Sequence, residues 1–270
     1  MTTIRALPGY FTHVTEEDVT NAASSSPPLF KKFQLATSSW AALDAKLTGA
    51  RAAGRDVKVV YLVRHAEGIH NAAEREFGTD VWEKEFAKSE AYLDADLTEF
   101  GCNDALEKGP PALDAERAKG MPAIERVVVS TLSRAIHTAQ LFFSKYAVSS
   151  PQFVSMELCR EVMGVHTCDK RVSLTQLKKK FSDVDFAFKG AAVLDEDDVL
   201  WSPTHRETDA EIQARAMRFL DQFFHAIPDK YVAVVAHSKF IRSLYEVLLP
   251  NEADVFPSNC EVIPIVLERA

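Results

Sequence analysis

Residues 57–63 of this 270-residue chain are VKVVYLV, a run of strand length in which β-branched and apolar residues follow one another almost without interruption. Such a run is typical of a strand covered on both faces, as in a parallel sheet flanked by helices. Comparable runs are VVV at 127–129, VSMEL at 154–158, YVAVV at 231–235 and VIPIVL at 262–267. We interpret these five segments as strands of one central sheet.

Helical patterns separate the strands. The clearest covers residues 208–226, where Thr208 and Glu211 form a T-x-x-E capping box and an apolar stripe follows from Ile212 to Phe223. Further helices are expected over residues 134–146 and 240–248. Alternation of strands with helices predicts an α/β fold, a three-layer α/β/α sandwich with a mostly parallel central sheet.

The first 55 residues differ from the remainder. They contain a polar break, SSSPP at 24–28, and then apolar residues at helical spacing, namely Trp40, Leu43 and Leu47. A segment this short and this polar is a poor candidate for a free-standing domain. We therefore predict a single domain over residues 1–270, in which residues 1–55 form an N-terminal arm or cap packed on a core of residues 56–270.

Composition narrows the choice of partners. The charge sum, 31 Lys and Arg against 39 Asp and Glu, is −8, and no extended Lys/Arg run is present, which argues against nucleic acid and anionic membranes as partners. Four scattered cysteines without a C-x-x-C pair and an N-terminus without an apolar segment predict a soluble, cytoplasmic protein with reduced thiols. The same charge sum would also disfavour an anionic substrate unless positive charge is concentrated in a pocket. The oligomeric state is left open.

Polar residues follow four of the strands, and in parallel sheets ligands bind at the carboxyl ends of strands. These residues are Arg64-His65, Ser130 to Arg134, Arg160-Glu161 and His237-Ser238. One such histidine would most often be structural, but two histidines with arginines at equivalent strand ends are hard to assign to packing. Guanidinium groups bind phosphate, a neutral imidazole can attack phosphorus, and a carboxylic acid can protonate a leaving group. The set predicts phosphoryl transfer through a phosphohistidine without a metal.

Four blocks of the sequence carry a family resemblance: RHAE at 64–67 with Asn71, DADLT at 94–98 with Gly101, STLSRA at 130–135 and VAHS at 235–238. Together they resemble the signature of the histidine phosphatase superfamily, also called phosphoglycerate mutase-like. The segment EVMGVHTCDKR at 161–171, with Phe77-Gly78 and Trp82, is similar to the fungal and plant phosphomutase-like members.

The resemblance implies a role for each matching residue. His65 would be the nucleophile, while Arg64, Arg134 and His237 would hold the phosphoryl group. Asn71 would line the pocket entrance, and the backbone of Ser238 would lie nearby. One branch of the family carries its proton donor directly after the second histidine, where this chain has Ser238, so Glu161 is expected to be the general acid. Ala66 replaces the usual glycine, so the backbone there should avoid positive φ.

Other residues have competing interpretations. Lys170 and Arg171 are expected to contact the remainder of the substrate, while Glu161 could instead be a surface carboxylate paired with Arg160. The acidic stretch 195–198 is predicted to be a solvated loop. His70 and His166 are expected to be ordinary polar residues, although His166 could shape the mouth of the pocket. Cys159, His166 and Cys168 lack a fourth ligand for a structural zinc site, so no metal or other cofactor is expected.

These sequence features are compatible with three alternative functions. The first is a metal-independent phosphatase acting on a small phosphorylated substrate. The second is a phosphomutase that moves phosphate within a small metabolite, which differs from a phosphatase in excluding water from the phosphoenzyme. The third is a non-catalytic protein that binds a phosphorylated ligand. The identity of the substrate is not predicted.

Overall fold

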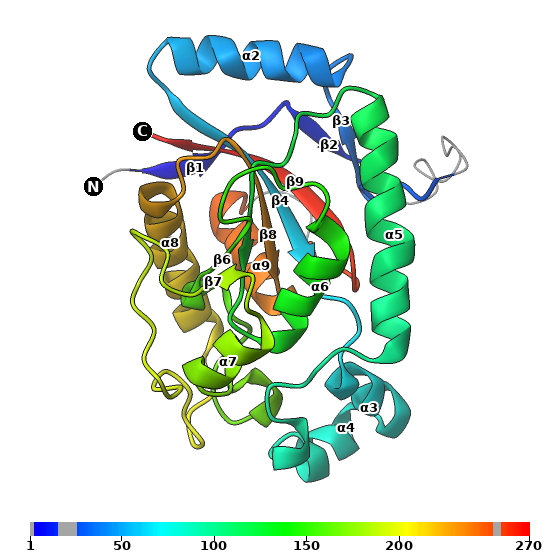
Figure 1. Cartoon of the computed structure of the whole chain (residues 1–270), viewed down its shortest axis with the longest axis vertical. Helices are drawn as coiled ribbons and strands as arrows, with labels where there is room; N and C mark the ends of the chain where they lie inside the picture. Colours follow the sequence, from blue (N-terminus) through cyan, green and yellow to red (C-terminus); the bar gives the residue numbers. More distant parts are fainter. Residues whose placement is uncertain (1–2, 16–25, 251–254) are drawn as a thin grey trace.

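The structure is a computed structural model, and it describes residues 3–15, 26–250 and 255–270. Ser24 and Ser25 of the polar break lie outside these residues. A seven-stranded sheet in the order β1-β9-β4-β8-β5-β6-β7 runs through the middle of the molecule (Figure 1). The strands from β4 through β8, β5 and β6 to β7 are parallel, whereas β9 is antiparallel to both of its neighbours. The predicted α/β class with a mostly parallel central sheet is thereby confirmed.

The elements have the following bounds. The sheet consists of β1 (Ile4–Ala6), β4 (Asp56–Arg64), β5 (Arg126–Val129), β6 (Phe153–Ser155), β7 (Val184–Asp185), β8 (Tyr231–Ala236) and β9 (Val262–Arg269), and β2 (Phe11–His13) pairs with β3 (Phe33–Leu35) in a separate hairpin. The helices are α2 (Trp40–Ala52), α3 (Ile69–Phe77), α4 (Thr79–Val81), α5 (Glu99–Ala118), α6 (Ser133–Phe143), α7 (Leu174–Lys180), α8 (Asp209–Ala226) and α9 (Ser238–Leu248). Short helical turns are η1 (Trp82–Phe86), η2 (Glu90–Tyr92), η3 (Glu157–Cys159) and η4 (Thr167–Asp169).

The register of the central strands positions the site. All six residues of β8 and the middle seven of β4 are buried, as the uninterrupted apolar runs predicted. Arg64 at the end of β4 is level with Ala236 at the end of β8, and Val129 at the end of β5 is level with Val235. The next residues, His65 and His237, therefore leave the sheet at one level, and Ser130 leaves it one residue earlier.

Two pairs of helices flank the sheet, α5 with α6 and α8 with α9 (Figure 1). Helix α8 begins as predicted, since the hydroxyl of Thr208 accepts from the Glu211 N–H and completes a capping box. Helix α5 was not predicted because Pro110 and Pro111 stand in its interior, where proline removes backbone hydrogen bonds. The Tyr146 hydroxyl donates to the Pro110 carbonyl at 2.9 Å.

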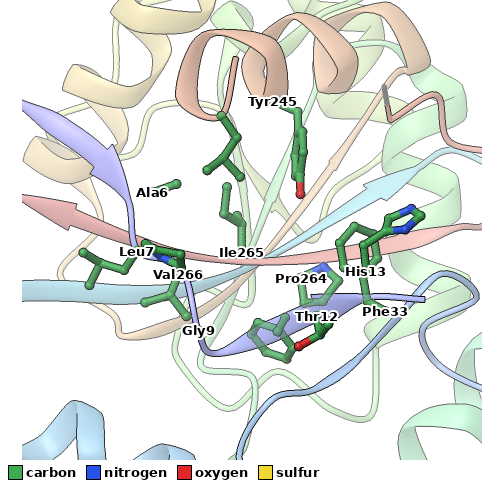
Figure 2. A pocket seen from close by; sticks show the side chains of 13 residues that line it. Ala6, Leu7, Gly9, Thr12, His13, Phe33, Tyr245, Pro264, Ile265 and Val266 are labelled. Atoms are coloured by element: carbon green, nitrogen blue, oxygen red, sulfur yellow. The ribbon is translucent and has the colours of Figure 1, made fainter. Parts of the chain in front are cut away.

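The described part of the N-terminal segment packs on the sheet. Strand β1 adds to the edge of the sheet along β9, and the α2 residues Trp40, Leu43 and Leu47 are buried in the main apolar core. The arm, β9 and α9 enclose a cavity of about 200 Å³, around which Figure 2 shows Phe33, Tyr245 and Ile265. None of the described residues lining this cavity belongs to the predicted site. No helix in the described ranges has the length and apolar character needed to cross a membrane.

Candidate active site

Two buried histidines face each other where β4 and β8 end. The ring centroids of His65 and His237 lie 5.0 Å apart. Their exposed fractions are 2% and 0%. The strand register explains the pairing, because each histidine is the first residue beyond its strand. The structure thus brings together two residues that the sequence predicted at neighbouring strand ends.

Hydrogen bonding fixes the tautomer of His65. Its Nδ1 lies 2.6 Å from the Ala66 carbonyl oxygen, and because a carbonyl only accepts, the proton must be on Nδ1. The other ring nitrogen, Nε2, accepts from the Nε–H of Arg134 at 3.2 Å. Burial, and then the charges of Arg134 and Arg64, hold the pKa of His65 well below its usual value. His65 is therefore neutral at neutral pH, with its electron pair on Nε2, where it accepts from Arg134.

Among the described residues, three nitrogens beside His65 are buried without a hydrogen-bond partner, namely Nδ1 of His237, Nε of Arg64 and Nδ1 of His70. Other atoms of the first two side chains have partners, since Nε2 of His237 lies 2.8 Å from the Ser130 hydroxyl and Nη1 of Arg64 donates to the Pro257 carbonyl at 2.9 Å. Buried polar atoms in folded proteins nearly always have partners. The Nε–H of Arg64 lacks an acceptor, and an oxyanion bound beside the neutral imidazole would supply one.

The buried carboxylate of Asp169 forms an ion pair with Arg134. Its Nη2 donates to Oδ1 of Asp169 at 2.8 Å, and the other carboxylate oxygen accepts from Nη1 of Arg206 at 2.8 Å. Burial alone would raise the pKa of Asp169, but Arg206 and Arg134 outweigh it and lower that pKa to about 2. The two guanidinium groups and one carboxylate leave a net charge of +1. Neither Asp169 nor Arg206 was identified from sequence, because both lie in segments without regular apolar spacing.

The segments around residues 64–67 and 94–101 are joined by contacts, and the second of them also positions helix α6. The buried carboxylate of Asp94 accepts from the N–H and from the hydroxyl of Ser133, both at 2.8 Å, and so caps the helix that carries Arg134. Thr98 donates to the Glu67 carboxylate at 2.9 Å. A Cβ on Gly101 would lie 2.2 Å from the Glu67 carbonyl oxygen, so the close approach of the two segments requires glycine.

Glu161 lies at the N-terminus of α9, two residues beyond η3. Its carboxylate accepts from the Val162 N–H at 3.0 Å and from the Ser238 hydroxyl at 3.2 Å. Arg64 is close enough for Glu161 to act on its charge. Glu161 as a residue is half-buried.

Comparison with known proteins identifies the family of the chain. The sequence profile of the Histidine phosphatase superfamily (branch 1) matches residues 60–265. The chain belongs to the histidine phosphatase superfamily.

Individual relatives of the superfamily carry two kinds of name. A phosphoglycerate mutase-like protein of Arabidopsis thaliana is 33% identical over 78% of this chain and 84% of its own length. A probable phosphatase of Schizosaccharomyces pombe is 26% identical over 77% of this chain and 87% of its own length. The crystal structure of phosphoglycerate mutase from Bacillus anthracis str. Sterne shares the fold, with a TM-score of 0.50 and 20% identity over 78% of this chain and 88% of that one.

The alternative pairing of Glu161 with Arg160 is not found in the structure. The guanidinium of Arg160 is buried and donates to Glu157 at 2.9 Å and to Asp198 at 2.8 Å, so Glu161 is not its ion-pair partner. Asp198 is itself buried, with a side-chain exposure of 1%. The prediction of a solvated acidic loop at 195–198 is therefore wrong for Asp198, because the buried Arg160 requires a counter-ion.

The expectation that Arg171 contacts the substrate is not met. Its Nε donates to Glu157 at 2.8 Å, and its two terminal nitrogens donate to the carbonyl oxygens of residues 172, 195, 196 and 197. All five N–H groups of the guanidinium are thus occupied, and the side chain is buried. Arg171 holds the 195–198 loop in place. Lys170 lies with its Nζ 4.9 Å from the centre of the Trp201 ring, and its contact with a substrate stays a prediction.

Asn71 and Ser238 have local roles besides the predicted ones. The Asn71 side-chain oxygen accepts from the Gly68 N–H at 3.0 Å and so caps α3, while the Ser238 hydroxyl binds Glu161. The backbone near Ala66 is compatible with alanine, since Ala66 is not among the described residues with positive φ. Contact of Asn71 and Ser238 with a substrate stays a prediction.

One group of metal-binding residue types lies next to the site. His166, Cys168 and Asp169 have ligand atoms within 4.8 Å of one another, whereas Cys159, which the sequence grouped with them, is not part of the cluster. Asp169 already pairs with two arginines, and burial raises the pKa of the Cys168 thiol well above its usual value. Both effects disfavour a bound cation, because a metal requires a thiolate and a carboxylate free to bind it.

Proposed function

We propose that this protein is a metal-independent phosphatase that hydrolyses a small phosphomonoester through a phosphohistidine on His65, with Glu161 as general acid. One observation carries the proposal: the neutral His65 holds its proton on Nδ1, and unpaired nitrogens of Arg64 and His237 are buried beside it. Phosphate-ester hydrolysis is among the slowest uncatalysed reactions, so positioned positive charge must supply most of the rate enhancement.

The proposed reaction has two halves. Nε2 of His65 forms a bond to phosphorus while the bond to the ester oxygen breaks, and a protonated Glu161 gives its proton to that oxygen. Water then attacks the phosphohistidine, Glu161 takes a proton from the water, and Nε2 leaves with its electron pair. Arg64, Arg134 and His237 donate hydrogen bonds to the phosphoryl oxygens, where charge is concentrated in the transition state.

The exposure of Glu161 favours hydrolysis over a mutase reaction. A mutase must keep water from its phosphoenzyme and retain the intermediate. The incomplete burial of Glu161 supports access of water to the group that would activate it. The mutase remains the second candidate, because a relative named mutase-like is 33% identical to this chain.

The test is a screen of sugar phosphates, phosphoglycerates, nucleotides and inositol phosphates, with free phosphate and isomer measured in the same reactions and His65→Ala as the blank. Free phosphate and an acid-labile phosphoenzyme on rapid quench are expected, both unaffected by a chelator. Isomer without free phosphate would instead assign a mutase. Tight phosphate binding with no phosphoenzyme would assign a non-catalytic binding protein, and activity restored only by added zinc would contradict the metal-free mechanism.

A further inference from the structure

A third histidine lies beside the nucleophile. The ring centroid of His70, in the first turn of α3, is 5.7 Å from that of His65. Its exposed fraction is 9%. The charged and titratable groups that act on it are Arg134, Asp169, Arg64 and His166. His70 thus lies within the same set of charges as His65, although sequence analysis predicted an ordinary polar residue there.

The hydrogen bonding of His70 is incomplete. Its Nδ1 is buried without a partner, and among the described residues no hydrogen bond to its Nε2 is formed. A buried donor or acceptor left unpaired destabilises a fold, so such a residue is expected to have a partner in some functional state. The nearby Gly68 makes room for the ring, because a Cβ at that position would lie 2.7 Å from both Nδ1 and Cε1 of His70.

We propose that His70 is a further substrate-binding residue, whose imidazole donates a hydrogen bond to a phosphoryl oxygen of the bound phosphomonoester. This inference rests on the proposed function. His65 cannot be the partner of His70, because its Nδ1 is bound to the Ala66 carbonyl and its Nε2 to Arg134.

The charges around His70 favour an anion as its partner. Burial, and next the Arg134 charge, lower the pKa of His70 well below its usual value, so the ring is neutral at neutral pH. The carboxylate of Asp169 is engaged by Arg134 and Arg206 and does not accept from His70. A neutral imidazole among guanidinium groups has one N–H to give, and a phosphoryl oxygen is the acceptor that the same guanidinium groups attract.

The experiment compares three substitutions of His70. His70→Leu removes the donor, His70→Asn can place an N–H near the position of Nδ1, and His70→Gln can place one near Nε2. The control is His137→Leu, at a half-buried histidine whose charged neighbours are Asp96 and Lys180. Each variant is measured for kcat and KM with p-nitrophenyl phosphate, for inhibition by orthovanadate and for its melting temperature.

We expect His70→Leu to weaken inhibition by orthovanadate about 10- to 100-fold, as for loss of a hydrogen bond to a charged group, and one of the two amides to restore most of it. The melting temperature of His70→Leu should equal or exceed that of the wild type, since an unpaired buried nitrogen is replaced by an apolar group. His137→Leu should leave orthovanadate inhibition unchanged.

Two results would overturn the inference. One is a His70→Leu protein that keeps its kcat, KM and orthovanadate inhibition within twofold. The other is a melting temperature that falls with His70→Leu and recovers together with activity in an amide variant, which would make the role structural. If His70→Leu does not fold, titration of ¹⁵N-histidine-labelled wild type with inorganic phosphate decides, with the His70 signal assigned from His70→Gln. A His70 imidazole signal that does not move would refute the contact.

Failure of the phosphatase proposal would look different. The wild type would then release no phosphate and form no phosphoenzyme. Binding of inorganic phosphate, measured by the same titration, reports on His70 whether or not turnover occurs.

Discussion

Nε of Arg134 lies 3.2 Å from Nε2 of His65, so the electron pair of the proposed nucleophile accepts a hydrogen bond from the guanidinium. A bond of this length between an uncharged acceptor and a cation keeps His65 unprotonated and oriented. When a phosphoryl group arrives, the same N–H is placed to turn to a phosphoryl oxygen, which frees the electron pair for attack. Arg134 would thus both hold the nucleophile and bind its target.

Replacement of the nucleophile tests this arrangement most directly. His65→Ala should lower kcat about 10⁴-fold or more with every phosphomonoester, because no other group can form the covalent intermediate. The measurement is p-nitrophenyl phosphate hydrolysis with rapid-quench detection of phosphoenzyme. Substantial activity in His65→Ala would remove His65 from the reaction.

Asp169 is predicted to affect substrate binding through its ion pair with Arg134. Asp169→Asn keeps an acceptor but removes the charge that Arg134 and Arg206 share, so KM should rise about 10-fold or more and the melting temperature should fall, as expected for a broken buried ion pair. The matched control is Asp229→Asn, which disturbs the buried pair with Arg126 at the opposite end of β5. The control should lose stability and keep its KM. A rise in KM in both variants would mean that Asp169 affects only folding.

The loss of kcat/KM on replacing Glu161 should increase with the basicity of the leaving group. In Glu161→Gln, kcat/KM should fall about 10²–10⁴-fold for an alkyl phosphate, whose leaving oxygen requires a proton, and much less for p-nitrophenyl phosphate. Using kcat/KM restricts the comparison to steps up to phosphoryl transfer. An equal loss with both substrates would show that Glu161 does not protonate the leaving group.

Stability should fall as the pH is lowered from 7.5 to 5.5. Burial holds the pKa values of His65, His70 and His237 well below the value of about 6.5 that each has in the unfolded chain. The unfolded state therefore takes up protons that the folded state does not. The contribution of these histidines is fully present above about pH 6.5 and is lost as the pH falls toward their folded-state pKa values.

The contribution of Asp94 to the pH dependence of stability has the opposite sign. Burial raises its pKa to about 6, so its contribution is present below the pKa of an unfolded aspartate and is lost as the pH rises through 6. Three histidine protons against one carboxyl proton leave a net loss of up to about 3 kcal/mol per pH unit on acidification. Thermal unfolding at pH 7.5, 6.5 and 5.5 measures it, and His70→Leu should show a shallower dependence. A melting temperature that is constant over this range would contradict the assignment.

Several features of the site could be predicted from sequence because they depend on strands. The apolar runs of β4, β5 and β8 are unambiguous, and polar residues directly after them must meet at one sheet edge, which located His65, Ser130 and His237. Asp169 and Arg206 could not be found in this way, since their positions depend on loops whose paths follow from tertiary contacts. The expectation that Arg171 contacts the substrate failed for the same reason. The backbone carbonyl groups that accept hydrogen bonds from its guanidinium belong to a loop whose path cannot be predicted from sequence. Helix α5 was not predicted, because the low helix propensity of Pro110 and Pro111 indicates the end of a helix.

The order of the strands in the sheet has a consequence for how the protein is made. Strand β4 carries Arg64 and leads directly to His65, yet its two neighbours in the sheet, β8 and β9, come from the last 40 residues of the chain. During synthesis, the proposed nucleophile therefore leaves the ribosome well before the strands that hold it in place and before His237. Long-range pairing of this kind closes late in folding. A nascent or C-terminally truncated chain would carry the reactive histidine without its pocket, so the activity can arise only once the whole sheet is assembled.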